Sequence, residues 1–196
     1  MKIVVYAISK NEEKFVKRWY ESMKEADKVV VLDTGSTDNT VSLLKECGAD
    51  VYQEAIVPWR FDKARNKSLS LIPKDYDICV CTDLDEVFEP GWKEKLLNAW
   101  KDNTTRMRYT YNWSFDEYGN PATTFLLNKI HLRNSYIWTH PVHEVLTPQN
   151  VENEATCEDI ILNHYPDITK SRSNYLPLLE LSVKEDAEDD RNMHYL

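Results

Sequence analysis

Long hydrophobic runs, a cysteine framework and an excess of positive charge are all absent from this chain of 196 residues. No apolar stretch reaches the roughly 18 residues that span a bilayer. The formal net charge is −9, with 24 Lys and Arg against 33 Asp and Glu, which leaves no basic stripe for a phosphate backbone. We therefore expect no transmembrane segment and no nucleic-acid partner. An anionic ligand must be held locally, by a metal ion or by an arginine.

Cysteine and glycine are also scarce. The four cysteines, at positions 47, 79, 81 and 157, form neither a disulfide framework nor a zinc motif, so we expect reduced thiols. Only four glycines are present and no low-complexity linker interrupts the chain, which favours one domain with a single core. The first residues already have the pattern of a strand rather than of a signal peptide, and we expect a cytoplasmic protein.

The first half of the chain alternates strand and helix patterns. Apolar, β-branched runs predict strands at 2–8, 28–32, about 50–53 and 78–81, separated by amphipathic helices. We expect Asn11 and Thr37 to cap the first two helices, and Gly48 to end the second. This βαβ order predicts an α/β fold with a mostly parallel central sheet and helices on both faces.

Acidic residues follow two of these strands directly. The run 78–81 leads to Asp83, Asp85 and Glu86, and Asp33 follows the second strand. If the backbone stays extended through Leu84, the side chains of Asp83 and Asp85 lie on one side while Leu84 points into the core. Carboxylates at the carboxyl edge of a parallel sheet suit a ligand site, and hard oxygen ligands suit Mg²⁺ or Mn²⁺. The alternative is a pair of solvated loop acids.

The second half has a mixed pattern. Pro90 and Gly91 precede a helix, residues 106–113 alternate, residues 116–120 suggest a hairpin turn, and strands follow at 123–133 and 159–165. We expect a smaller, partly antiparallel second half and an acidic helix over 171–190. No obvious cap precedes the last residue, so the chain is possibly a fragment of a longer protein.

Five motifs occur in order along residues 2–165: ISKNEE, VVVLDTGSTDNT, FDKARN, CTDLDE and WTHPVHEVL. This set resembles the family 2 glycosyltransferases of GT-A fold, and is particularly similar to small bacterial and viral members in which the module heads a longer chain. The resemblance implies one Rossmann-like GT-A domain, with a nucleotide-binding half at about 1–90 and an acceptor-binding half at about 91–170. It also places the protein in the cytoplasm of a bacterium or of a virus-infected host cell.

The resemblance further implies an activity and its residues. The expected reaction is metal-dependent, inverting transfer of a sugar from a nucleotide diphosphate, preferably UDP, to a hydroxyl or other nucleophile on a glycan, protein or peptide. Mn²⁺ or Mg²⁺ neutralises the leaving diphosphate in such a reaction. The implied nucleotide-binding residues are Ser9, Asn11, Glu12, Asp33, Arg65 and Asp83; the implied metal ligands are Asp85, Asp83 and His164; Glu144 is the implied general base; Trp138, His140 and His143 are the implied acceptor contacts.

Several of these residues also have purely structural interpretations. Asn11 could only cap a helix, Asp33 could only form a turn, Arg65 could only pair with Asp62 on a solvated helix face, and His164 could be a core residue.

Two other functions stay open at this point. An apolar strand followed by Asp83 and Asp85 also resembles the nucleophile and acid/base motif of haloacid-dehalogenase-type phosphatases, although that motif normally occupies the first strand. The third possibility is a non-catalytic nucleotide- or carbohydrate-binding module. The oligomeric state is left open.

Overall fold

The computed structural model describes residues 1–167, 175–188 and 194. The elements in chain order are β1 (Ile3–Ser9), α1 (Glu13–Met23), β2 (Lys28–Asp33), α2 (Thr40–Cys47), β3 (Asp50–Gln53), α3 (Phe61–Ser70), β4 (Ile78–Cys81), β5 (Glu86–Phe88), α4 (Trp92–Ala99), β6 (Arg106–Phe115), β7 (Pro121–Leu132), β8 (Tyr136–Thr139), β9 (Val145–Pro148), β10 (Glu154–His164) and α5 (Tyr175–Glu185). None of the helices in this described part is long and apolar enough to cross a membrane.

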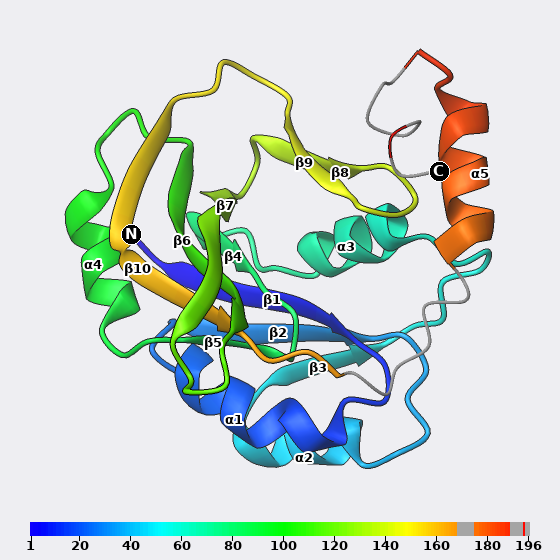
Figure 1. Ribbon diagram of the computed structural model, residues 1–196, viewed down its shortest axis with the longest axis horizontal. Coiled ribbons are helices and arrows are strands. Elements are labelled where there is room, and N and C mark those ends of the chain that lie inside the picture. The colour runs from blue at the N-terminus through cyan, green and yellow to red at the C-terminus, as the bar shows by residue number, and fades with distance from the viewer. Residues whose placement is uncertain (168–174, 189–193, 195–196) are drawn as a thin grey trace.

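One sheet of eight strands runs through both halves of the chain, in the order β3-β2-β1-β4-β7-β6-β10-β5 (Figure 1). The first four strands of this order are mutually parallel. Beyond β4 the sheet is mixed, because β7 is antiparallel to both β4 and β6, whereas β10 is parallel to β6 and antiparallel to β5. A separate hairpin contains β8 and β9. The predicted α/β fold, with a parallel first half and a mixed second half, is confirmed.

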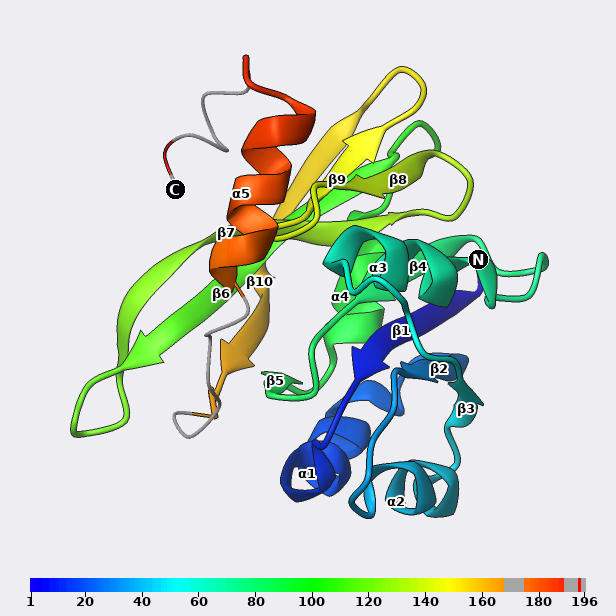
Figure 2. The same ribbon diagram turned by 90° about the vertical axis from the view of Figure 1, so that its right-hand side faces the viewer.

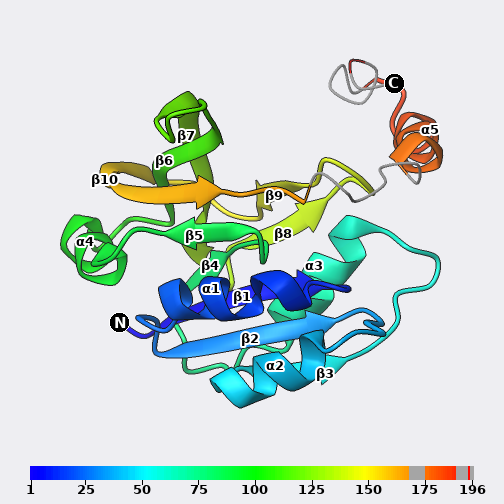
Figure 3. The same ribbon diagram turned by 60° about the horizontal axis from the view of Figure 1, so that its bottom comes forward.

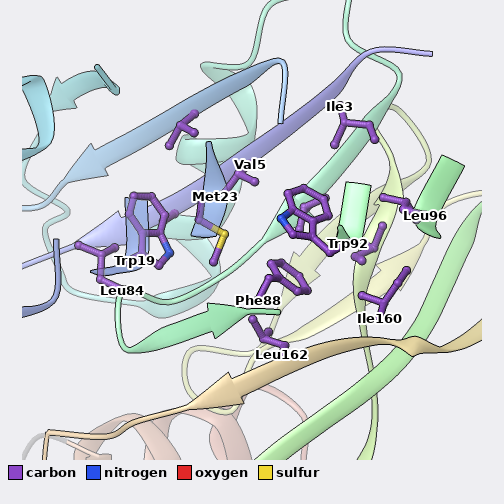
Figure 4. Packing of buried hydrophobic residues seen from close by; sticks show 14 of the residues in the cluster. Ile3, Val5, Trp19, Met23, Leu84, Phe88, Trp92, Leu96, Ile160 and Leu162 are labelled. Atoms are coloured by element: carbon purple, nitrogen blue, oxygen red, sulfur yellow. The ribbon is translucent and has the colours of Figure 1, made fainter. Parts of the chain in front are cut away.

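Helices cover both faces of the sheet because both faces are apolar. In β1, Val5 belongs to a buried cluster with residues of α1, α2 and α4, whereas Val4 and Tyr6 belong to a cluster with Ile72, after α3, and with the β8–β9 hairpin. Figure 2 shows α1 and α2 on one side of β1 and α3 on the other, and Figure 4 shows packing in the first cluster. Alternate side chains of a strand point to opposite faces, so a continuous apolar strand produces two cores. Helices α4 and α5 lie at opposite ends of the molecule (Figures 1 and 3).

Two of the predicted caps are wrong. Helix α1 follows Glu12 and not Asn11, whose φ of 55° is left-handed. Helix α2 begins at Thr40 and not after Thr37, whose backbone N–H donates to Asn11 Oδ1 at 2.8 Å. The polar side chains expected at the caps instead join the β1–α1 loop to the β2–α2 loop. Gly48 ends α2 as predicted, with a φ of 106°. Of the helix predicted over 171–190, Tyr175–Glu185 is helical, and 171–174 and 189–190 lie outside the described residues.

A buried polar chain links the parallel half of the sheet to β7 and β8. Trp138 Nε1 donates to the Tyr6 hydroxyl at 2.8 Å, and that hydroxyl lies 2.9 Å from His131 Nε2. His131 Nδ1 lies 2.9 Å from the Leu132 carbonyl oxygen, which can only accept, so Nε2 is the acceptor for Tyr6. Burial lowers the pKa of His131 to about 4, and the neutral ring satisfies this chain.

This arrangement predicts an acid-sensitive core. The pKa of His131 is lower in the folded protein than its ordinary value of 6.5, so the unfolded chain binds the proton more readily. The His131 contribution to stability is therefore complete above pH 6.5 and is lost as the pH falls from 6.5 to about 4, by on the order of 3 kcal/mol. Urea unfolding at pH 7 and pH 4.5 should show a smaller pH dependence in His131→Gln. An equal dependence in both proteins would contradict the prediction.

Candidate active site

A cavity of about 1220 Å³ opens beyond the carboxyl ends of β1 and β4 and is bordered by β6, β7, β10 and α5. It brings together most of the residues that the sequence singled out: Ser9, Asn11, Glu12, Arg65, Asp83, Asp85, His143, Glu144 and His164. Asp33, Trp138 and His140 are not among its lining residues. The predicted convergence of strand ends therefore produces one site, from which these last three residues are set apart.

The acidic motif forms a tight turn, and the expected extended backbone through Leu84 is wrong. The backbone N–H of Glu86 donates to the Asp83 carbonyl at 3.1 Å, which closes the turn before β5 begins. Leu84 is nevertheless only 2% exposed and belongs to the same buried cluster as Trp19 of α1 (Figure 4). Leu84 thus anchors the turn in the core, and both Asp83 and Asp85 border the cavity.

Glu86 holds this turn from inside. It is almost fully buried, and its Oε2 accepts the backbone N–H of Asp83 at 2.8 Å. Its Oε1 accepts the Tyr111 hydroxyl at 2.9 Å and lies 3.9 Å from Lys129 Nζ. Burial raises the pKa of Glu86. No role for Glu86, Tyr111 or Lys129 was expected from the sequence; the available signals were a third acid after the strand and a lysine next to Ile130 within a predicted strand.

Arg65 is the buried cation of the site. It is 3% exposed; its Nη2 donates to Asp83 Oδ1 at 2.7 Å and its Nε to Glu144 Oε1 at 2.8 Å. Lys129 Nζ lies 3.5 Å from the other oxygen of Asp83. Burial opposes ionisation of Asp83, but these two cations outweigh it and hold the pKa of Asp83 well below its ordinary value. The solvated-face interpretation of Arg65 is therefore wrong, and Asp62 pairs with Arg60 instead.

Asp85 and His164 form a second pair in the cavity. His164 Nε2 lies 3.5 Å from Asp85 Oδ2, and Nδ1 lies 3.1 Å from the backbone oxygen of Trp113. Because that carbonyl can only accept, Nδ1 carries a proton and Nε2 faces the carboxylate, which is the orientation of many metal-binding histidines. Burial opposes protonation of the ring, but the hydrogen bond and charge of Asp85 outweigh it and raise the pKa of His164. Strand β5 sets this distance, since Glu86 pairs with His164 in the β5–β10 ladder.

The donor set fits a divalent cation that is shared with a ligand. Among the described residues, no three His, Cys, Asp or Glu side chains are grouped closely enough to hold a metal ion by themselves. Asp85 and His164 would supply two protein ligands, and Asp83 lies in the same turn. Mg²⁺ is commonly bound by one or two carboxylates together with substrate phosphates and water. The site therefore suits a cation that arrives with a phosphate-bearing ligand.

The loop after β1 forms the opposite wall of the cavity. Ser9, Asn11 and Glu12 line it, and the hydrogen bonds to the β2–α2 loop fix this segment. The backbone N–H of Asn11 donates to Ser36 Oγ at 2.8 Å, and that of Glu12 donates to Thr40 Oγ1 at 2.7 Å.

Asp33 acts within these loops. It is fully buried; its Oδ2 accepts the hydroxyl of Ser9 at 3.0 Å and that of Ser36, and its Oδ1 accepts the N–H groups of Gly35 and Ser36 at 3.1 and 2.9 Å. Both carboxylate oxygens are thus used within the protein. The turn-former interpretation describes these contacts, and a direct nucleotide contact by Asp33 stays a prediction.

These contacts predict that Asp33→Ala destabilises the folded protein. The buried Ser9 hydroxyl and three donors of Gly35 and Ser36 in partly buried hydrogen bonds would lose their acceptor, so we expect the free energy of unfolding to fall by about 2–4 kcal/mol. Urea unfolding measures the effect, with Ser36→Ala as a milder control that removes one hydroxyl donor. Unchanged stability together with lost nucleotide binding would show that Asp33 serves the ligand and not the loop.

The three expected acceptor residues lie in different surroundings. Trp138 is 2% exposed, donates to Tyr6 and packs against the Arg65 guanidinium, whose carbon lies 5.4 Å from its ring centre. Its location in the core is the reason that it cannot offer a surface to an acceptor. His140 and His143 both have positive φ angles around Pro141, and only His143 lines the cavity. The His143 ring meets Tyr175 of α5 edge-on at 5.8 Å, so α5 contributes to this wall.

Comparison with known proteins gives a family and a fold. The profile described as glycosyl transferase family 2 matches residues 4–150, three quarters of the chain. The glucosyl-3-phosphoglycerate synthase of Petrotoga mobilis is 38% identical over 112 residues, which are 50% of this chain and 34% of that enzyme. A crystal structure of a mycobacterial protein shares the fold, with a TM-score of 0.61 and 18% identity over 86% of this chain and 68% of the other.

A further likeness is partial. The crystal structure of glucosyl-3-phosphoglycerate synthase from Mycobacterium tuberculosis with Mn²⁺, UDP and glucosyl-3-phosphoglycerate is 25% identical, with a TM-score of 0.49 over 57% of this chain and 44% of that enzyme. This overlap is too low to transfer its ligands to the present cavity. The chain also spans only about a third of the length of its curated relative. The profile match covers all five motifs, and the observed sheet agrees with it: the chain belongs to glycosyl transferase family 2.

Proposed function

We propose that this chain is a metal-dependent, inverting glycosyltransferase that uses a nucleotide-diphosphate sugar, preferably a UDP-sugar, and an acceptor nucleophile on a glycan, protein or peptide. The observation that carries the proposal is the joint placement of Asp85 and His164, 3.5 Å apart, with buried Arg65 and Lys129 in one cavity at the carboxyl edge of the sheet. Asp85 and His164 are of the types that bind metal ions, and a metal ion together with the two cationic side chains would neutralise the charge of a leaving diphosphate. Family membership agrees with this chemistry.

The proposed roles follow from the positions in the cavity. Ser9, Asn11 and Glu12 border the nucleoside, and Asp33 supports their loop. Arg65 and Asp83 contact each other at the cavity wall, and the ribose and diphosphate would bind beside them. Asp85 and His164 would hold Mn²⁺ or Mg²⁺, with Asp83 beside them. The bound cation would neutralise charge that develops on the leaving diphosphate.

Glu144 is the proposed general base. Its Oε1 is already engaged by Arg65 Nε, so the other oxygen is the one to accept the proton of the acceptor hydroxyl. Arg65 thereby connects Glu144 to Asp83 on the donor side, and this bridge fixes the carboxylate in the cavity. A fixed carboxylate suits a single displacement, in which the acceptor attacks from the face opposite the diphosphate. His143 is the neighbouring candidate for an acceptor contact.

The cytoplasm is the proposed location. The four cysteines are all free thiols in the structure, and two of them are buried on β4, which agrees with a reducing compartment. The division into a nucleotide half and an acceptor half near residue 90 is part of the same proposal.

A screen of nucleotide sugars with Mn²⁺ tests the function directly. We expect metal-dependent binding of a UDP-sugar and its slow hydrolysis, and inversion at the anomeric carbon in product NMR. Retention of configuration would reject the inverting mechanism. UDP binding without hydrolysis or transfer would support the binding-module alternative. The family match removes support for the phosphatase alternative, which would need a phosphoenzyme on Asp83.

A further inference from the structure

A row of aromatic side chains leads out of the cavity along β6. Tyr111 and Trp113 lie two residues apart on the strand, and their ring centres are 6.2 Å apart. Phe125 lies opposite Tyr111 on β7, with ring centres 5.3 Å apart. We name Tyr111, Trp113 and Phe125 the aromatic row. It begins at the acidic turn, where the Tyr111 hydroxyl bonds Glu86, and it follows the β6–β7 hairpin, which projects from the rest of the sheet (Figure 2).

Burial in the core explains only the inner end of the row. Tyr111 is 4% exposed, whereas Trp113 and Phe125 are 43% and 44% exposed. Trp113 borders the cavity, and its ring stacks on His164 with centres 4.6 Å apart and an angle of 25°. His164 covers one face of the Trp113 indole, beside the proposed metal ligand. The exposed part of the indole therefore lies away from His164. The row therefore offers flat apolar surface that starts next to the proposed site of transfer.

The charges of the cavity indicate that the acceptor, bound beside the donor diphosphate, is uncharged. Among the described residues, its lining carboxylates outnumber its lysines and arginines: Glu12, Asp83, Asp85, Glu86, Glu144 and Asp167 against Lys10, Arg65 and Lys129. Arg65 and Lys129 already lie within 4 Å of carboxylates. An anionic acceptor would add negative charge beside the donor diphosphate, and like charges at close range are unfavourable. A neutral acceptor avoids this repulsion.

The strand arrangement favours a saccharide over an extended peptide. Strand β6 pairs with β10 along residues 106–112, and the Trp113 backbone oxygen lies 3.1 Å from His164 Nδ1, so the edge of β6 that borders the cavity is occupied and not free for backbone pairing with a peptide. A pyranose ring instead has an apolar face of C–H groups, which can stack on the electron-rich face of an aromatic ring. The hydroxyl groups of the sugar then face water and the carboxylates of the cavity. The two exposed rings of the row, Trp113 and Phe125, lie on different strands, so the row offers more than one aromatic contact.

We propose that the aromatic row binds the acceptor of the transfer reaction, and that this acceptor is an uncharged glycan of two or more sugar units. Trp113 stacks on the unit next to the reacting hydroxyl, and Phe125 contacts a unit farther from the cavity. This assignment rests on the proposed function, since it gives the substrate class of the same site.

Binding measurements on the full chain with Mn²⁺ and UDP test the assignment. The neutral probes are maltotriose, chitotriose and mannotriose, and the anionic probe is 3-phosphoglycerate; saturation-transfer NMR and titration report binding. We expect at least one neutral trisaccharide to bind more tightly than 3-phosphoglycerate. We expect Trp113→Ala and Phe125→Ala each to weaken that binding, Trp113→Ala by about 10-fold or more, as for other stacking contacts. Trp113→Phe should restore part of the loss.

Tyr118→Ala is the matched control, because Tyr118 is an aromatic residue of the same hairpin, 81% exposed and outside the row. UDP affinity, measured on every variant, separates the two proposals. Loss of UDP binding in the unmodified protein would defeat the proposed function, whatever the glycans do. With UDP bound, preference for 3-phosphoglycerate, or failure of all three trisaccharides to bind, would overturn the neutral-glycan proposal. Equal effects of Trp113→Ala, Phe125→Ala and Tyr118→Ala would overturn the role of the row.

Discussion

Asp85→Ala is expected to abolish metal-dependent UDP binding. The substitution removes one of the two side chains that face each other across 3.5 Å at the proposed metal position, and leaves His164 as a single ligand. Loss of an outer-shell partner alone typically costs 10–100-fold in metal affinity, so loss of this ligand should cost about 100-fold or more. Calorimetric titration of UDP with and without Mn²⁺ measures the effect, and Mn²⁺ paramagnetic resonance reports metal binding separately.

Asp102→Ala is the control for this experiment, because it removes an exposed carboxylate that is not among the residues lining the cavity. Folding of the Asp85 variant is not expected to change, since the buried anchor of the turn is Leu84, and Glu86 still accepts the Asp83 N–H. Undiminished metal-dependent binding in Asp85→Ala would show that the cation, if it binds, is held elsewhere.

Glu144→Gln is expected to lower turnover on the order of 10²-fold or more while UDP-sugar binding is retained. The glutamine keeps the shape of the side chain and a carbonyl oxygen that can accept from Arg65 Nε, so the buried arginine keeps this hydrogen bond. It loses the negative charge and the capacity to take a proton from the acceptor. Steady-state rates at saturating donor, together with donor affinity by titration, separate the chemical effect from the binding effect.

Glu117→Gln, in the turn of the β6–β7 hairpin, gives the matched charge removal away from the site. Normal turnover in Glu144→Gln would send the role of base to another group. If inversion is still observed, the single displacement would stand. A large drop in UDP-sugar affinity would instead indicate that the Arg65 bridge to Glu144 and Asp83 serves mainly to shape the donor site.

Local pattern predicted the fold because the relevant signals are short-range. The four parallel strands follow from β-branched runs, and the helices between them follow from apolar residues at helical spacing. The carboxyl ends of parallel strands meet at one edge, so the proximity of Ser9 and Asp83 could also be deduced from the sequence. The caps were less predictable, because Asn11 and Thr37 bond to each other across two loops.

The sequence by itself therefore determined the α/β architecture, the acidic residues after β4 and the edge of the sheet at which they lie. Only the tertiary structure decided which side chains act together. Asp85 meets His164 because β5 pairs with β10, nearly 80 residues later in the chain, and Lys129 reaches Asp83 because β7 inserts beside β4. Trp138 enters the core for the same reason, through its bond to Tyr6. Such pairings depend on contacts between distant segments and on burial, and the local periodicity of a sequence does not report either.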